Sequence, residues 1–150
     1  LRRPRDPAAL RFDVLEMRRK MHAGHPNATD RFDLKHDAGG MVDVEFAVQS
    51  LVLAHAHDHA ELTRNAGNIA LLAIAGRLGL VPSDIAAAAA DAYRDYRRLQ
   101  HQIRLTGAAH ARVPRQTQTR ERAAVDALWR NVFGGPWTAE LPSRGRKLAP

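Results

Sequence analysis

Residues 41–57 are apolar on most faces of a helix and follow directly on a pair of glycines, Gly39 and Gly40. An ordinary strand has about five or six residues, so a run of this length indicates a helix. A helix with apolar side chains on most of its faces must be buried among other elements. The sequence therefore predicts a helix in the interior of the protein, with a glycine turn at its start.

Four other segments carry helical patterns. Asp6 is a good N-cap and Pro7 suits a first helical turn, so a helix is expected from there to about His22. Further helices are expected at about 63–77, at 83–105 and, after a cap at Thr119, to about 133. In the longest one, apolar residues alternate steps of four and three, as in a helix–helix contact; they are Ile85, Ala89, Ala92, Tyr96, Leu99 and Ile103.

The remaining segments are short or polar. Residues 32–35 alternate apolar and polar side chains, as a strand does, whereas 107–118 is typical of a polar loop. Residues 136–150 are basic and proline-containing without periodicity, so we expect a disordered tail there. The predicted fold is mainly α: a bundle of about five helices with one short strand or extended segment near residues 32–35.

Composition limits the class of protein. The 150 residues suffice for one domain with a core, and the low aromatic content of 5% predicts a core of small aliphatic side chains. The chain has no cysteine, which excludes disulfides and thiolate metal sites. No apolar stretch is long enough to cross a membrane. We therefore expect a cytoplasmic protein without a membrane partner.

The chain carries a net charge of +7, which favours anionic partners. Four arginines of the segment 83–105 can either line a groove for an anion or form a solvated helix face; they are Arg94, Arg97, Arg98 and Arg104. Few aromatic residues are interleaved with them to stack on bases. We therefore favour the solvated face and do not expect nucleic acid as a partner.

The segment from Lys35 to Glu45 concentrates polar groups just before the buried helix. Its two glycines, Gly39 and Gly40, allow close backbone approach, and free N–H groups at a helix start can bind a phosphate. Lys35 would add a positive charge there. The alternative is an ordinary helix start, in which acids such as Asp43 interact favourably with the helix dipole. The pattern alone favours this alternative.

Two pairs of residues have spacings that occur in metal sites. Asp43 and Glu45 would share one face of a strand, but on a helix they lie about 200° apart, which excludes a shared metal ion. His55 and His59 are spaced as zinc ligands on a helix, but at a helix end an interaction with the dipole is the better interpretation. The chain also has no Gly-Ser followed by an Asp-x-Asp pair, so it contains no recognised route to phosphoryl transfer by itself.

The segment Phe32–Phe46 with Val48 and Gln49 resembles the glutamine synthetase adenylyltransferase family (glutamate–ammonia ligase adenylyltransferase). Asp43 makes it more similar to the carboxy-terminal half of those two-headed enzymes. The resemblance extends over roughly residues 8–134 through further segments: Met17–Met21, Leu62–Asn65 with Asn68, Ala92–Arg94, Leu99–His101 and Val125–Phe133. It implies that residues 1–40 are the tail end of a nucleotidyltransferase domain and that 41–135 are a helical bundle domain.

The resemblance also implies a function. Members of the family transfer AMP from ATP to a tyrosine of glutamine synthetase with magnesium as cofactor, under control of the PII signal protein and glutamine. Their motif places five residues at the border of the nucleotide pocket: Lys35 on phosphate, Gly39 and Gly40 for close approach, and Asp43 and Glu45 in support. The family's metal-binding Asp pair is expected upstream of residue 1, so we expect a fragment that is inactive alone.

Two alternatives remain at this point. One is a non-catalytic helical module that binds glutamine synthetase or PII, which the alanine-rich helix contact and the basic surface favour. The other is the helical domain of a PII uridylyltransferase-like protein, because that family has a related helical domain. The length of the motif match favours adenylyl transfer over the second alternative, and the first stays open.

Overall fold

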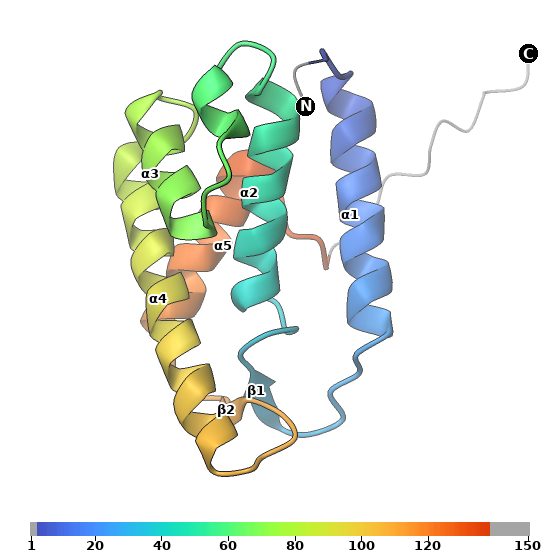
Figure 1. Ribbon diagram of the computed structural model, residues 1–150. Coiled ribbons are helices and arrows are strands. Elements are labelled where there is room, and N and C mark those ends of the chain that lie inside the picture. Colours follow the sequence, from blue (N-terminus) through green and yellow to red (C-terminus); the bar gives the residue numbers. More distant parts are fainter. Residues whose placement is uncertain (1–2, 139–150) are drawn as a thin grey trace, which may run out of the picture.

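The computed structural model describes residues 3–138, which form five α-helices, one 3₁₀ helix and a two-stranded antiparallel sheet (Figure 1). The helices are α1 (Pro7–Ala23), α2 (Met41–His55), η1 (Ala60–Thr63), α3 (Asn68–Arg77), α4 (Ser83–Leu105) and α5 (Thr119–Phe133). The strands are β1 (Arg31–Asp33) and β2 (Arg112–Pro114). The predicted bundle of about five helices is confirmed.

Helix α2 lies in the middle of the bundle, with α1 on one side and α3, α4 and α5 on the other (Figure 1). Most of its residues are buried, including the polar side chains of Asp43 and Ser50. The prediction that this segment is an interior helix is confirmed, although the helix ends at His55 rather than near residue 57. Because α2 contacts all the other α-helices, a side chain that is bonded to the first turn of α2 is held in place by the whole core.

Helix α4 packs along α3 and α5, as its apolar spacing predicted. Within the predicted contact stripe, Ala89, Ala92 and Tyr96 are buried, and its other members pack partly buried against the same core. Small residues let the helices approach closely: a Cβ atom added at Gly76 of α3 would lie 3.3 Å from the Cβ atom of Ala86. The alanine-rich sequence of α4 is therefore explained by packing.

The expectation of a polar loop over 107–118 is wrong for Arg112–Pro114, which form β2. This strand pairs with β1 in antiparallel register, with Val113 opposite Phe32 and Arg112 opposite Asp33. A strand of three residues with one buried side chain is too short to show an alternation of apolar and polar residues in the sequence. It is recognised only by its pairing with β1 in the structure. The predicted strand at 32–35 is shifted to 31–33, because Asp33 accepts hydrogen bonds from the N–H groups of Lys35 and His36 and turns the chain.

The first helix begins where the sequence predicts, whereas the starts of α3 and α5 differ from the prediction because of local capping. Asp6 caps α1 as expected, its side chain accepting a hydrogen bond from the N–H group of Ala8 at 3.1 Å. The third helix begins at residue 68 rather than 63, because η1 and the N-cap Gly67 precede it. Helix α5 begins at Thr119, the residue expected to be its cap, and the N-cap is Gln118 in a left-handed conformation with φ of 60°.

The expected disordered tail, residues 136–150, lies mostly outside the described residues. Its first residues belong to the fold: Trp137 is 6% exposed and covers the guanidinium group of Arg18 at 4.2 Å. Among residues 3–138, no helix is both long and apolar enough to cross a membrane.

Two leucine-to-alanine substitutions test the packing of the bundle. Leu72 of α3 is fully buried, whereas Leu105 at the end of α4 is 74% exposed. We expect Leu72→Ala to lower the free energy of unfolding by about 2–5 kcal/mol, because it leaves a cavity in the core, and Leu105→Ala to change it by less than about 0.5 kcal/mol. Urea unfolding followed by circular dichroism measures both values, and equal effects would contradict the position of α3.

Candidate functional site

The glycine pair lies in a tight turn between β1 and α2. A Cβ atom added at Gly40 would lie 2.6 Å from the carbonyl oxygen of Leu34 and 2.9 Å from that of Asp37. Gly39 has a φ of +87°, and a Cβ atom there would lie 3.3 Å from the Cβ atom of Arg122 on α5. Both glycines are therefore required by close approach within the protein itself, one to the turn's own backbone and one to α5.

The N–H groups at the start of α2 are not free. Those of residues 40–42 donate to carbonyl oxygens of the preceding turn, namely Asp37 (2.9 Å), Leu34 (2.8 Å) and Lys35 (3.0 Å). The N–H group of Gly39 donates to the Asp43 carboxylate, to Oδ2 at 2.8 Å. The donors that the sequence offered to a phosphate are thus occupied by the protein's own oxygens. The structure corresponds to the alternative, a glycine turn that starts a helix.

Asp43 is held by Arg18 of α1. The Arg18 Nε atom donates to Asp43 Oδ1 at 2.6 Å, and the two side chains are 0% and 4% exposed. The Arg18 Nη2 atom donates to the carbonyl oxygen of His36 at 2.7 Å. Burial raises the pKa of Asp43, while the positive charge of Arg18 and the hydrogen bond from Gly39 act in the opposite direction. One arginine thereby joins α1, the glycine turn and α2.

Glu45 faces away from Asp43, toward α3 and α4. The Tyr93 hydroxyl donates to Glu45 Oε1 at 3.4 Å and accepts a hydrogen bond from Asn68 Nδ2 at 3.3 Å. Burial raises the pKa of Glu45, and the positive charge of Lys35 and the bond from Tyr93 oppose the increase. Asp43 and Glu45 therefore have separate partners on different sides of α2.

The five residues predicted from the motif do not meet in one cavity. Gly39 and Asp43 border a cavity of about 430 Å³ between the turn and α5. Lys35 lines a different cavity of about 400 Å³ beside β1. Glu45 and Gly40 border neither, although Lys35 is near enough to Glu45 to affect its pKa.

The cavity that contains Lys35 is basic. Its other charged or titratable lining residues are His25, Asp33, His36, Arg104, His110 and Arg112. Asp33 is neutralised by Arg112, whose Nε atom lies 3.2 Å from its Oδ2 atom. Burial raises the pKa of Asp33, but hydrogen bonds from the N–H groups of His36 and Lys35 and from Arg112 lower it overall. Lys35, an exposed side chain, adds a further positive charge to this cavity.

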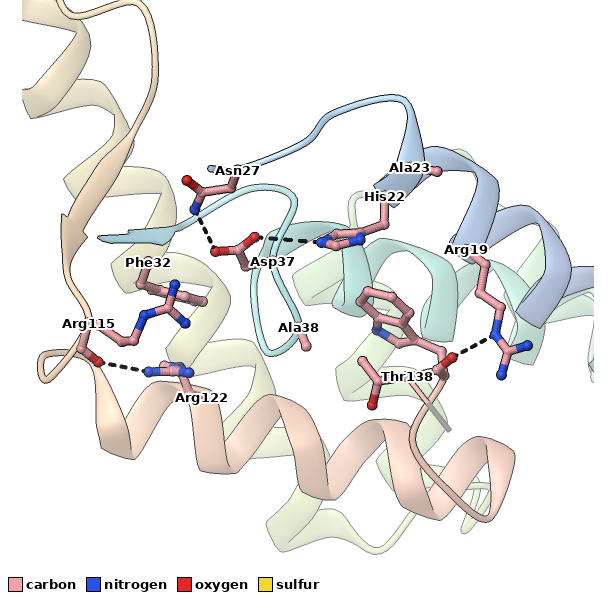
Figure 2. Close-up of a pocket in the computed structure, with 11 residues that line it drawn as sticks. Arg19, His22, Ala23, Asn27, Phe32, Asp37, Ala38, Arg115, Arg122 and Thr138 are labelled. Carbon is pink, nitrogen blue, oxygen red and sulfur yellow. Dashed lines mark hydrogen bonds and ion pairs between the residues drawn. The ribbon is translucent and has the colours of Figure 1, made fainter. Parts of the chain in front are cut away.

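A third cavity, of about 630 Å³, was not found by sequence reasoning (Figure 2). It is lined by Arg19 of α1, by Arg115 in the loop after β2 and by Arg122 of α5. Arg19 lies about a hundred positions before Arg115 and Arg122, so no local motif joins all three. One signal in the sequence is that neither Arg115 nor Arg122 has an acid three residues before it, the spacing that supplies the partners of Arg94 and Arg98.

The structure also places His55 and the four arginines of α4. His55 lies at the end of α2, and residues 3–138 contain no group of three or more His, Asp or Glu side chains that could hold a metal ion. The four arginines of α4 are exposed, and two of them, Arg94 and Arg98, form ion pairs one helical turn away with Asp91 and Asp95. Arg94, Arg97 and Arg98 form a solvated face, whereas Arg104 also lines the cavity that contains Lys35.

The ion pair beneath the turn yields a stability prediction. Asp43→Ala leaves the Arg18 charge buried and unpaired, so we expect it to lower the free energy of unfolding by about 3–5 kcal/mol. Glu16→Ala is the matched control, because Glu16 pairs with Lys20 at 3.6 Å on the exposed face of α1 and such pairs contribute about 0–1 kcal/mol. Urea unfolding gives both numbers. A loss below about 1 kcal/mol for Asp43→Ala would contradict the assignment.

Comparison with known proteins agrees with the motif. The family model described as GlnD PII-uridylyltransferase matches residues 11–127. The bifunctional glutamine synthetase adenylyltransferase/adenylyl-removing enzyme of Burkholderia mallei is 56% identical over 87% of this chain. Its counterpart in Bordetella bronchiseptica is 58% identical over 87%, and that of Aromatoleum aromaticum is 58% identical over 89%. The chain spans only 14% of the length of each of these relatives.

The match to adenylyltransferases supports the resemblance inferred from the glycine motif, and the family model covers most of the helical bundle. The chain belongs to the family described as GlnD PII-uridylyltransferase and is homologous to a segment of bifunctional glutamine synthetase adenylyltransferases.

Proposed function

We propose that the chain is the helical part of a glutamine synthetase adenylyltransferase, which transfers AMP from ATP to a tyrosine of glutamine synthetase. The observation that carries this proposal is the identity of 56–58% over most of the chain to enzymes of that name. In the proposal, residues 1–40 end a nucleotidyltransferase domain and 41–135 are the helical domain. One core joins the two parts, because Phe32 and Leu34 pack in the same cluster as the bundle.

The contacts of the motif support different roles for its members. Asp43 is committed to Arg18 and to the N–H group of Gly39, and Gly40 is fixed against the carbonyl oxygen of Leu34. We therefore assign Gly39, Gly40 and Asp43 to positioning the turn at the edge of the nucleotide pocket. Glu45 positions α2 against α4 through Tyr93.

Lys35 is the member of the motif that is suited to contact a phosphate directly. Its side chain is exposed, and it lines the basic cavity beside β1. The carboxylate in that cavity, Asp33, is already bound by Arg112 and by two N–H groups. An ATP phosphate is the anion that the family resemblance predicts for this lysine.

The residues 3–138 do not fit the magnesium ion that the family resemblance implies. Magnesium is bound by carboxylate oxygens in octahedral geometry, and this part of the chain contains no group of three acids or histidines that could hold it. The carboxylate of the motif, Asp43, is occupied by Arg18. We propose that the metal ligands lie elsewhere in the parent polypeptide and that this chain alone is inactive.

The partners in this proposal are glutamine synthetase and the PII signal protein, and the location is the cytoplasm. A second candidate function is that of a non-catalytic helical module, which either binds one of these proteins or forms the helical domain of a PII uridylyltransferase-like protein. The observation that favours it is the match of the bundle to a family described by that enzyme. The two candidates differ in whether substitutions at Lys35 alter AMP transfer.

Lys35→Ala in the longer polypeptide tests the proposed role in catalysis. We expect the rate of AMP transfer from ATP to glutamine synthetase to fall at least about tenfold. Such a fall corresponds to a loss of about 1.4 kcal/mol of transition-state stabilisation, the size expected for one charge contact to phosphate. Lys20→Ala is the control, because Lys20 is also an exposed lysine but lies on the outer face of α1. Incorporation of labelled AMP measures both. A rate equal to that of the control would remove Lys35 from the nucleotide pocket.

The 150-residue chain itself gives a second test. When the chain is incubated with ATP, magnesium and glutamine synthetase, we expect no transfer of AMP to glutamine synthetase, because the described residues of the chain supply no metal site. Activity would contradict the proposal. Retention of glutamine synthetase by the immobilised chain, together with unchanged transfer by the Lys35→Ala variant, would favour the non-catalytic module instead.

A further inference from the structure

The cavity shown in Figure 2 lies between α1, the glycine turn and the start of α5. Its volume of about 630 Å³ is within the range of small-molecule sites, about 300–1,000 Å³. Arg115 and Arg122 lie on one side of it, and Arg19 lies on the side of α1 (Figure 2). Arginines from the N-terminal and the C-terminal parts of the chain therefore line the same cavity.

The arginines of this cavity are held by uncharged groups. Arg122 donates through Nη1 to the carbonyl oxygen of Arg115 at 2.9 Å, and its guanidinium group lies 4.4 Å above the ring of Phe32. Arg19 donates through Nε to the carbonyl oxygen of Trp137 at 2.8 Å. The stem of Arg122 is fixed as well, because it packs on Gly39, where a side chain would collide with it. These contacts orient the guanidinium groups without neutralising them.

Arg115 is anchored in the same way. It donates to the carbonyl oxygen of Asp30 through Nε at 3.0 Å and to that of Arg31 through Nη2 at 3.3 Å. Within residues 3–138, no carboxylate forms an ion pair with Arg19, Arg115 or Arg122. By contrast, Arg130, farther along α5, is paired with Asp126 at 2.7 Å.

One carboxylate, Asp37, does line the cavity, but its oxygens have other partners. Oδ2 accepts hydrogen bonds from Asn27 Nδ2 and from the N–H group of Asp33, both at 2.9 Å. Oδ1 lies 3.7 Å from His22 Nε2. Three guanidinium groups against one occupied carboxylate leave a positive excess, which favours an anionic ligand.

We propose that this cavity binds a small molecule through a polyphosphate group, with Arg115 and Arg122 as the principal contacts and Arg19 closing the opposite side. Guanidinium groups match the paired oxygens of phosphate and are the preferred side chains for it. Two neighbouring arginines fit two linked phosphates better than a single one. The volume of about 630 Å³ matches that of small-molecule sites.

This site is separate from the cavity that contains Lys35. Phe32 lines the arginine cavity and Asp33 lines the lysine cavity, and successive strand residues point to opposite faces. None of the three arginines is a residue of the glycine motif, although Arg122 packs on Gly39 and also lines the cavity that Gly39 and Asp43 border. The inference therefore goes beyond the proposed function and does not depend on it.

Titration of the 150-residue chain with inorganic pyrophosphate at low ionic strength tests the proposal. We expect saturable binding, followed by calorimetry and by the fluorescence of Trp137 at the cavity wall. Arg115→Gln and Arg122→Gln should each raise the Kd at least about tenfold, which corresponds to 1.4 kcal/mol. Arg94→Gln, which removes the same charge from an exposed arginine paired with Asp91, should change it less than about twofold. Circular dichroism and urea unfolding establish that the variants are folded.

Several outcomes would overturn the proposal. They are absence of saturable binding at millimolar pyrophosphate, an equal loss of affinity in Arg94→Gln, and equally tight binding of succinate, which would indicate a carboxylate site. Loss of pyrophosphate binding in Lys35→Ala with full binding in Arg122→Gln would assign the anion to the other cavity. A chain that binds pyrophosphate as expected while Lys35→Ala leaves AMP transfer unchanged would retain this inference and reject the proposed function.

Discussion

The buried ion pair between Arg18 and Asp43 is the interaction on which the rest of the structure depends. It joins α1 to the start of α2, and the second carboxylate oxygen of Asp43 holds the N–H group of Gly39. A buried charge pair is costly when its remaining hydrogen-bonding groups lack partners. Here the carbonyl oxygen of His36 accepts from Arg18 Nη2 and the ring of Trp137 lies over the guanidinium group, while Arg18 Nη1 is buried without a hydrogen-bond partner among residues 3–138. The motif's carboxylate is therefore a structural support, and the turn it holds brings Arg122 against the backbone.

Much of the fold can be predicted from the sequence, because helices leave periodic signals. The interior helix, the contact stripe of α4 and the cap at Asp6 all follow from local patterns. Strand β2 cannot be predicted in this way, since its single buried side chain, Val113, acquires meaning only opposite Phe32. The start of α3 differs from the prediction because η1 and the N-cap Gly67 come before the helix.

The candidate site shows the same division. Local sequence identified the glycine turn and its acids, and spacing alone separated Asp43 from Glu45. It did not reveal that Asp43 meets Arg18, because the two are 25 residues apart, or that Gly39 is required by contact with α5. The arginine cavity depends on similar long-range contacts. Groups that bind ligands are found by local motifs only when a single segment carries them.

Amide hydrogen exchange at residues 39–42 distinguishes a glycine turn whose N–H groups are bonded within the protein from one that is open to a phosphate. We expect these N–H groups to exchange as slowly as those in the middle of α2, because each is bonded within the protein. We also expect that adding a nucleotide or pyrophosphate leaves their exchange unchanged. Fast exchange in the free protein, followed by protection when a phosphate ligand is added, would contradict the account and restore an open phosphate-binding turn.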